Sequence, residues 1–178
     1  DQGASVFCDS KYAADKPDDH TVRLTLLYTP GTRGGYPDQA TQDLGRHHIL
    51  YALYPHAGDW RQARSFAQAA RLNEAPIPMV ATSHPGTLGR SFSLAKSSDP
   101  AVSISALKKA EASDEIVVRL REHTGKAGKA VKLSFAKPVV SARLVDGQER
   151  ELSKATVQDG QLVTDIGAYE LRAFAVTL

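Results

Sequence analysis

The chain has few of the residues and segments that mark specialised proteins. Its 178 residues include one cysteine, one methionine and one tryptophan, and no apolar run reaches the roughly 18 residues of a membrane span. The single cysteine, Cys8, excludes an internal disulfide framework, and no CxxC pair is present to hold zinc through thiolates. Packing of a hydrophobic core must therefore supply the stability of the fold.

An excess of one charge is also missing. Twenty-two Lys and Arg residues against 20 Asp and Glu residues give a net charge of +2, and the two signs alternate along the chain. We therefore expect neither a nucleic-acid nor a membrane partner. Residues 1–3 lack the basic and apolar pattern of a signal peptide. The compartment stays open, with the cytoplasm and the periplasm favoured.

Several catalytic motifs are absent from the sequence. No GxGxxG, GxxxxGK[ST], HExxH or GxSxG occurs, which excludes the usual dinucleotide, phosphate-loop, zincin and α/β-hydrolase sites.

The first half of the chain predicts two strands, a long loop and one helix. Alternation of apolar residues predicts a half-buried strand over 21–29, and apolar residues on both faces of 47–54 predict a central strand. The Pro- and Gly-rich segment 30–45 predicts a loop kept for a purpose. Apolar residues at helical spacing from Arg61 predict a helix that ends near Asn73.

The second half predicts repeated short strands. A Phe92–Ala95 strand precedes a polar linker, Lys96–Pro100, and we place a domain boundary there, between domains 1–97 and 98–178. The dipeptides Asp146-Gly147 and Asp159-Gly160 predict tight hairpins. Six short strands in about 80 residues are typical of an antiparallel β-sandwich. The predicted strands cover residues 102–108, 115–121, 130–135, 139–145, 162–165 and 169–178.

The densest group of candidate ligands and proton carriers consists of Asp43, His47, His48 and His56. Adjacent residues of a strand point to opposite faces, so His47 and His48 cannot share one metal ion without a bulge. Two interpretations remain open from the residues alone. In the first, the histidines satisfy hydrogen bonds within the fold; in the second, a pair of them faces a cleft and binds a hydroxyl-rich ligand.

A longer segment around these residues resembles a known family. Residues 36–60, YPDQATQDLGRHHILYALYPHAGDW, are similar to a signature of glycoside hydrolase family 38 α-mannosidases, roughly P-D-x-x-A-D-x-G-x-H-x-F-x-Y-A-L-x-P-H-x-G-x-W. Upstream, residues 9–15 resemble the block N-D-S-K-Y-G-Y-D. Downstream, residues 107–111 and 116–122 resemble the blocks L-K-K-A-E-D-x-D and V-V-R-L-Y-E. Separate blocks in the same order extend the resemblance over most of the chain.

The resemblance implies the fold and the partners of the chain. It implies an all-β fold: the last part of a β-supersandwich like that of galactose mutarotase, with one helix, followed by a small antiparallel β-sandwich. It also implies that the whole enzyme is a retaining hydrolase of terminal α-mannosides, with zinc and the aspartate nucleophile in an N-terminal catalytic domain. We therefore expect no catalytic residue and no metal in this chain.

The same resemblance suggests how the chain takes part in the reaction. It is expected to pack on the catalytic domain and to shape the sugar cleft, with Asp43 and His47, then Arg46 and Tyr51, as hydrogen-bond partners of mannoside hydroxyls. Two alternatives remain: a stand-alone carbohydrate-binding β-sandwich, and a structural module whose exposed apolar face also allows a homo-oligomer.

Overall fold

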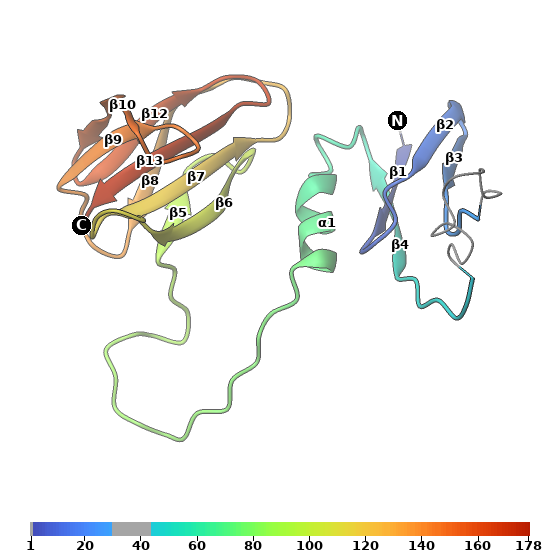
Figure 1. Ribbon diagram of the computed structural model, residues 1–178, viewed down its shortest axis with the longest axis horizontal. Coiled ribbons are helices and arrows are strands. Elements are labelled where there is room, and N and C mark those ends of the chain that lie inside the picture. The colour runs from blue at the N-terminus through green and yellow to red at the C-terminus, as the bar shows by residue number, and fades with distance from the viewer. Residues whose placement is uncertain (1, 30–43) are drawn as a thin grey trace, which may run out of the picture. The chain divides into compact units, whose positions relative to one another are not determined.

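The structure, a computed structural model, describes residues 2–29 and 44–178. The chain divides into two compact units, residues 1–79 and residues 80–178 (Figure 1). Strands dominate both units, as the predicted all-β fold requires. No helix in the described ranges is both long and apolar enough to cross a membrane.

The first unit contains small sheets and one helix. Strands β1 and β4 form an antiparallel pair in which Cys8 lies opposite Tyr51, and β2 pairs with β3. Helix α1 packs on β1 and ends at Asn73 as predicted; the Asn73 side chain donates to the Cys8 carbonyl at 3.3 Å. The elements are β1 (Gln2–Cys8), β2 (Ala14–Asp18), β3 (Thr21–Leu24), β4 (Tyr51–Ala57) and α1 (Ser65–Asn73).

Three predictions for this unit need correction. The strand predicted over 21–29 ends at Leu24, and the strand predicted over 47–54 runs from Tyr51 to Ala57. Among the described residues β4 pairs with β1 alone, so it is not a central strand; its side chains alternate between exposed and half-buried instead. The helix begins four residues after Arg61, because residues 59–64 form a turn first.

The second unit is a β-sandwich. One sheet has the strand order β10-β9-β13-β7-β6 and the other the order β11-β12-β8-β5. The first residues of the unit, 80–94, precede its first strand. The strands are β5 (Ala95–Ser97), β6 (Val102–Lys109), β7 (Ile116–Glu122), β8 (Gly128–Phe135), β9 (Ser141–Val145), β10 (Glu151–Lys154), β11 (Thr156–Gln158), β12 (Gln161–Ile166) and β13 (Leu171–Thr177).

Alternation along the strands fills the space between the two sheets. On β7, Val118 and Leu120 point inward, and Phe174 lies opposite Val118 in the β13–β7 ladder. Leu133 and Leu162 are opposite each other in the facing sheet and are fully buried. Burial of these side chains is the main stabilising contribution to the sandwich.

The segment around the predicted domain boundary differs from the sequence-based expectation. The strand predicted at Phe92–Ala95 lies at Ala95–Ser97, so Lys96 and Ser97 belong to a strand and not to a linker. Ala95, Lys96 and Ser97 pair with Phe135, Ser134 and Leu133 of β8. These pairings join the residues just before position 98 to the sandwich; the boundary at 97/98 itself stays a prediction.

A buried carboxylate closes one end of the sandwich. The Glu122 side chain, at the end of β7, is 1% exposed. It accepts hydrogen bonds from the backbone N–H groups of Thr124, Gly125 and Tyr169 at 2.6, 2.8 and 2.9 Å, and from the Thr124 hydroxyl. Burial alone would raise the pKa of Glu122, but these hydrogen bonds outweigh it and lower the pKa to about 2. Glu122 is therefore ionised and, through these hydrogen bonds, holds the loop at Thr124 and Gly125 next to the loop at Tyr169.

Candidate functional site

The predicted sugar-binding residues lie in or next to one segment, residues 44–60, which we call the motif segment. Arg46 and His47 have exposed side chains in an irregular stretch before β4, and Tyr51, at the start of β4, is 55% exposed. Asp43 lies outside the described residues. Because the strand begins only at Tyr51, His47 lies outside the strand that was predicted to include it.

His56, the other histidine of the motif segment, is a structural residue. Its ring nitrogen Nδ1 lies 3.1 Å from the Gly58 carbonyl oxygen, and Nε2 lies 3.1 Å from Ser5 Oγ. A carbonyl only accepts, so Nδ1 donates to Gly58, and Nε2 shares the second hydrogen bond with the Ser5 hydroxyl. Ser5 Oγ lies 2.7 Å from Ser65 Oγ at the start of α1. The histidine thereby links β4, β1 and α1, and both nitrogens are occupied.

Close backbone approach around His56 requires glycine at two positions. A Cβ added to Gly3 would lie 2.5 Å from the His56 ring. Gly58 has φ +67°, and a Cβ there would lie 2.1 Å from Gln62 Oε1. The turn that follows is held by a reciprocal pair: Asp59 Oδ1 accepts from the Gln62 N–H at 2.9 Å, and Gln62 Oε1 accepts from the Asp59 N–H at 3.2 Å. The motif residues thus build the corner between β4 and α1.

Aromatic side chains complete this corner. The Tyr54 ring lies 5.4 Å from the His56 ring and 6.0 Å from the Phe7 ring, between ring centroids. The Arg61 guanidinium lies 4.5 Å from the centre of the Trp60 ring. Packing of Tyr54 and His56 accounts for the inner side of β4, whereas Tyr51 and Leu53 on its other side remain exposed.

The hydrogen-bonded serines were missed from the sequence. Ser5 lies in β1, which the sequence did not predict, since Gly3 and Ala4 weaken the alternation of its side chains. Ser65 lies in the predicted helix, where nothing in the spacing marks it as the buried polar contact of α1. Neither residue belongs to a local motif that names its partner.

The described residues do not fit a metal site. Within residues 2–29 and 44–178, no three His, Cys, Asp or Glu side chains come together in a way that could hold a metal ion. Nor does the motif segment bring two carboxylates together across a cleft, the arrangement that glycoside hydrolysis requires: Asp59, its one described acidic residue, is held in the turn.

A β-sandwich preceded in the sequence by the motif segment is the arrangement that the resemblance to glycoside hydrolases predicts for the β-domain portion of such a protein. A family profile described as "Glycosyl hydrolases family 38 C-terminal beta sandwich domain" matches residues 101–174, from the start of β6 into β13. Residues 101–174 therefore belong to the C-terminal β-sandwich domain of glycoside hydrolase family 38, and the resemblance found in the sequence is confirmed.

Named relatives agree with this family. The chain is 31% identical to alpha-mannosidase 2C1 of Mus musculus over 187 residues, which cover 100% of the chain and 17% of the relative. It is 31% identical to alpha-mannosidase 2C1 of Homo sapiens over 182 residues, which cover 99% and 16%. Alpha-mannosidase G of Dictyostelium discoideum is 29% identical over 133 residues, which cover 71% of the chain and 11% of the relative. The chain thus spans less than a fifth of the length of these relatives.

Proposed function

We propose that the chain is a non-catalytic C-terminal portion of a retaining, zinc-dependent α-mannosidase that hydrolyses terminal α-mannosides. It packs on the catalytic domain of the same enzyme and shapes the sugar cleft. The relatives that support this proposal carry the name α-mannosidase, and most of their length lies outside the match, which leaves room for a catalytic domain. Since the described residues do not fit a metal site, the proposal assigns zinc to that other domain.

The observation that carries the proposal is the exposed apolar surface of the first unit. On β4, Leu53 is 69% exposed next to the exposed Tyr51, and further exposed apolar side chains follow β3 at residues 26–28. Two-stranded sheets are marginally stable by themselves, and adjacent exposed apolar side chains mark surfaces that another domain covers. A catalytic domain of the same enzyme is a partner that fits such a surface.

The first prediction is complementation of activity. We expect the purified chain alone not to hydrolyse an aryl α-mannoside in the presence of zinc, and we expect activity when it is combined with the remaining portion of the enzyme. The measurement is release of the aryl alcohol by chain, remaining portion and mixture. Activity of the chain alone would contradict the assignment of the catalytic residues. Inactivity of the mixture, together with binding of methyl α-mannoside by the chain alone at the motif segment, would favour a stand-alone carbohydrate-binding module.

The second prediction concerns the residues that touch sugar. In the reconstituted or complete enzyme, His47→Ala and Tyr51→Phe are expected to raise KM for the aryl mannoside by about tenfold, because each removes a hydrogen bond to a sugar hydroxyl. Asp43→Asn and Arg46→Gln are also expected to raise KM for the aryl mannoside.

A matched control separates sugar binding from general damage. Tyr12→Phe removes the hydroxyl of another exposed tyrosine in the first unit, and it should leave KM unchanged. If Tyr51→Phe, His47→Ala and the unmodified enzyme had equal KM values, the motif segment would not contact the sugar. This conclusion would hold even if complementation succeeds.

A further inference from the structure

A hollow of about 390 Å³ lies on the five-stranded sheet of the sandwich, beside the turn between β9 and β10 (residues 146–150) and the start of β13. We call it the outer hollow. Arg119 lies opposite Ala173 in the β13–β7 ladder, and the neighbours Val118 and Phe174 are in the core, so Arg119 and Ala173 point to the outer face. Residues that line the hollow include Arg119, Asp146, Leu152, Glu170, Leu171 and Ala173.

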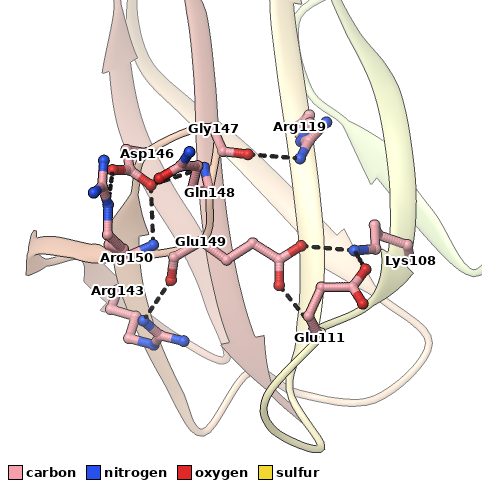
Figure 2. Close-up of polar contacts among 9 residues, drawn as sticks. All are labelled: Lys108, Glu111, Arg119, Arg143, Asp146, Gly147, Gln148, Glu149 and Arg150. Atoms are coloured by element: carbon pink, nitrogen blue, oxygen red, sulfur yellow. Dashed lines mark hydrogen bonds and ion pairs between the residues drawn. The ribbon is translucent and has the colours of Figure 1, made fainter.

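Arg119 is the least satisfied cation at this place. Its terminal nitrogen Nη2 donates to the Gly147 carbonyl, a bond drawn in Figure 2, over a distance of 3.3 Å. Among the described residues no carboxylate lies within ion-pair distance of Arg119, and Glu149, which is paired with Lys108, acts on it only through a longer-range electrostatic attraction. Its Nε is buried and has no hydrogen-bond partner among those residues. Buried donors are normally paired, and a long bond to a neutral carbonyl is a weak arrangement for a guanidinium. Because Nε is closed to solvent, an acceptor oxygen in the hollow would meet the terminal nitrogens.

The charges around Arg119 favour a neutral ligand. Asp146 is paired with Arg150 at 2.7 Å, and Glu170 with Arg172 at 3.0 Å. Each carboxylate keeps lone pairs that accept further hydrogen bonds. The hollow therefore offers donors from Arg119 and acceptors from Asp146 and Glu170. Because each carboxylate is neutralised by its own arginine partner, the one charge left over is that of Arg119. Hydroxyl groups match this mixture because each one both donates and accepts, whereas a free anion would also face the two carboxylates.

The walls of the hollow are apolar. Leu152 on β10 is 61% exposed and Leu171 on β13 is 67% exposed, and Ala173 forms part of the floor. A ligand that covers these side chains needs an apolar surface next to its hydroxyl groups. Binding sites for small molecules commonly combine apolar walls with a few polar groups in a volume of this order.

We propose that the outer hollow binds a neutral sugar ring. A hexopyranose presents vicinal hydroxyls to Arg119, Asp146 and Glu170 and lays the C–H groups of one ring face against Leu152 and Leu171. The Gly147 carbonyl, which holds Arg119 through the bond of 3.3 Å, is the contact that a sugar oxygen replaces or shares. This proposal does not depend on the catalytic assignment, since the site belongs to the sandwich alone.

The test is a titration of the isotope-labelled 178-residue chain with methyl α-mannopyranoside, followed by amide NMR shifts. We expect saturable shifts at the amides of Gly147, Leu171 and Ala173. Arg119→Met keeps the apolar stem and removes the donors, and it should weaken binding by about tenfold. Leu171→Ser, at an exposed position that leaves the core intact, should weaken it severalfold. Arg121→Met, which removes an exposed arginine from the same strand and face, should leave binding unchanged.

Three results would overturn the proposal. The first is the absence of saturable shifts at the hollow in the folded chain. The second is equal weakening by Arg119→Met and Arg121→Met. The third is an equal response to the linear polyol mannitol, since that would show no recognition of a ring. Shifts confined to residues 44–60 would instead locate sugar binding at the motif segment, and the complementation experiment tests the catalytic partner separately.

Discussion

Glu122 is a single side chain that organises an end of the sandwich. Its carboxylate receives N–H groups from two loops, at Thr124 and Gly125 on one side and at Tyr169 on the other. Gly125 adopts φ +74°, and a Cβ there would lie 2.6 Å from the Tyr169 ring, so the two loops meet closely. A charged acceptor at this place satisfies donors that the loops cannot pair with each other.

The third prediction follows from the low pKa of Glu122. Its pKa is about 2 in the folded chain and 4.5 in the reference state, which corresponds to about 3 kcal/mol of stability at neutral pH. That contribution is complete above the unfolded pKa and is lost as the pH falls through 4.5 toward 2. Glu122→Gln should therefore lower the free energy of unfolding of the sandwich by about 3 kcal/mol at pH 7 and flatten its dependence on acidic pH.

Urea unfolding of both proteins between pH 7 and pH 2 measures this difference. Glu151→Gln makes the same chemical change at an exposed residue of β10 and should behave like the unmodified chain. Parallel pH profiles for Glu122→Gln and the unmodified chain would show that the carboxylate does not act through its charge.

Residue-level features were predictable only where a pattern encodes them. The alternation that places Val118 and Leu120 on one face continues to Glu122, so burial of this glutamate follows from the period of two. Its hydrogen-bond partners do not, because Tyr169 is 47 residues away. The two hydrogen bonds of His56 differ in the same way. The bond to Gly58, two residues away, follows from the local turn. The bond to Ser5, 51 residues away, depends on the pairing of β1 with β4 and cannot be predicted from the local sequence.

At the scale of elements, the two predicted hairpins behave differently. Asp159 and Gly160 have φ of 50° and 71° and connect β11 to β12 as a tight turn, as predicted. Asp146-Gly147 also lies in a hairpin, between β9 and β10, but neither residue has a positive φ, and Glu149 takes that conformation with φ 66°. The Asp146 carboxylate accepts the N–H groups of Gln148 and Arg150 instead, and this lengthens the turn.

The longer turn brings Glu149 across the outer face of the sheet (Figure 2). Glu149 Oε1 lies 2.7 Å from Lys108 Nζ, and Oε2 accepts from the Glu111 N–H at 2.8 Å. The bonds to Lys108 and to the Glu111 N–H hold the pKa of Glu149 below its ordinary value. The turn is thereby tied to the β6 end of the sheet.

The fourth prediction tests this tie. Glu149→Gln removes the ion pair with Lys108 and weakens the acceptor for the Glu111 amide, so hydrogen exchange of that amide should become about tenfold faster. Amide exchange measured by NMR gives the rate. Glu111→Gln removes only the exposed ion pair to Lys108 and should leave the rate nearly unchanged; equal rates in both variants would contradict the role of Glu149.

Element boundaries depended on how strongly each segment alternates. The strands β6, β7, β8 and β12 lie where the sequence places them, since their apolar residues alternate over several positions. Four strands were not predicted, because they are short or have polar or small residues on both faces: β1, β2, β10 and β11. For β4, the apolar residues before Tyr51 led to a predicted start at residue 47, four residues too early. The pairing with β1 begins at Tyr51.

For the whole molecule, the order of the parts was predictable from the sequence and the details of the first unit were not. Turn signals and short alternating runs give the sandwich directly, and the family profile matches its residues 101–174. The same reasoning did not predict the strands of the first unit correctly. Its exposed Tyr51 and Leu53 carry the apolar pattern of a covered strand, and the cover is not supplied by the strands described in this chain. A sequence records that a surface is apolar, but not which chain segment covers it.

The lengths of the outermost strands have a further consequence for self-association. The smaller sheet of the sandwich ends in β5 and β11, with three residues each, and the larger sheet ends on one side in the four-residue β10. Short edges give a second molecule little backbone to extend. In the first unit, β1 and β4 are seven residues long, and each has one neighbour among the described strands. The other edge of the larger sheet is β6, which is eight residues long. Pairing between separate copies of the chain would therefore begin at the long edges β1, β4 and β6 and not at the short edges β5, β10 and β11.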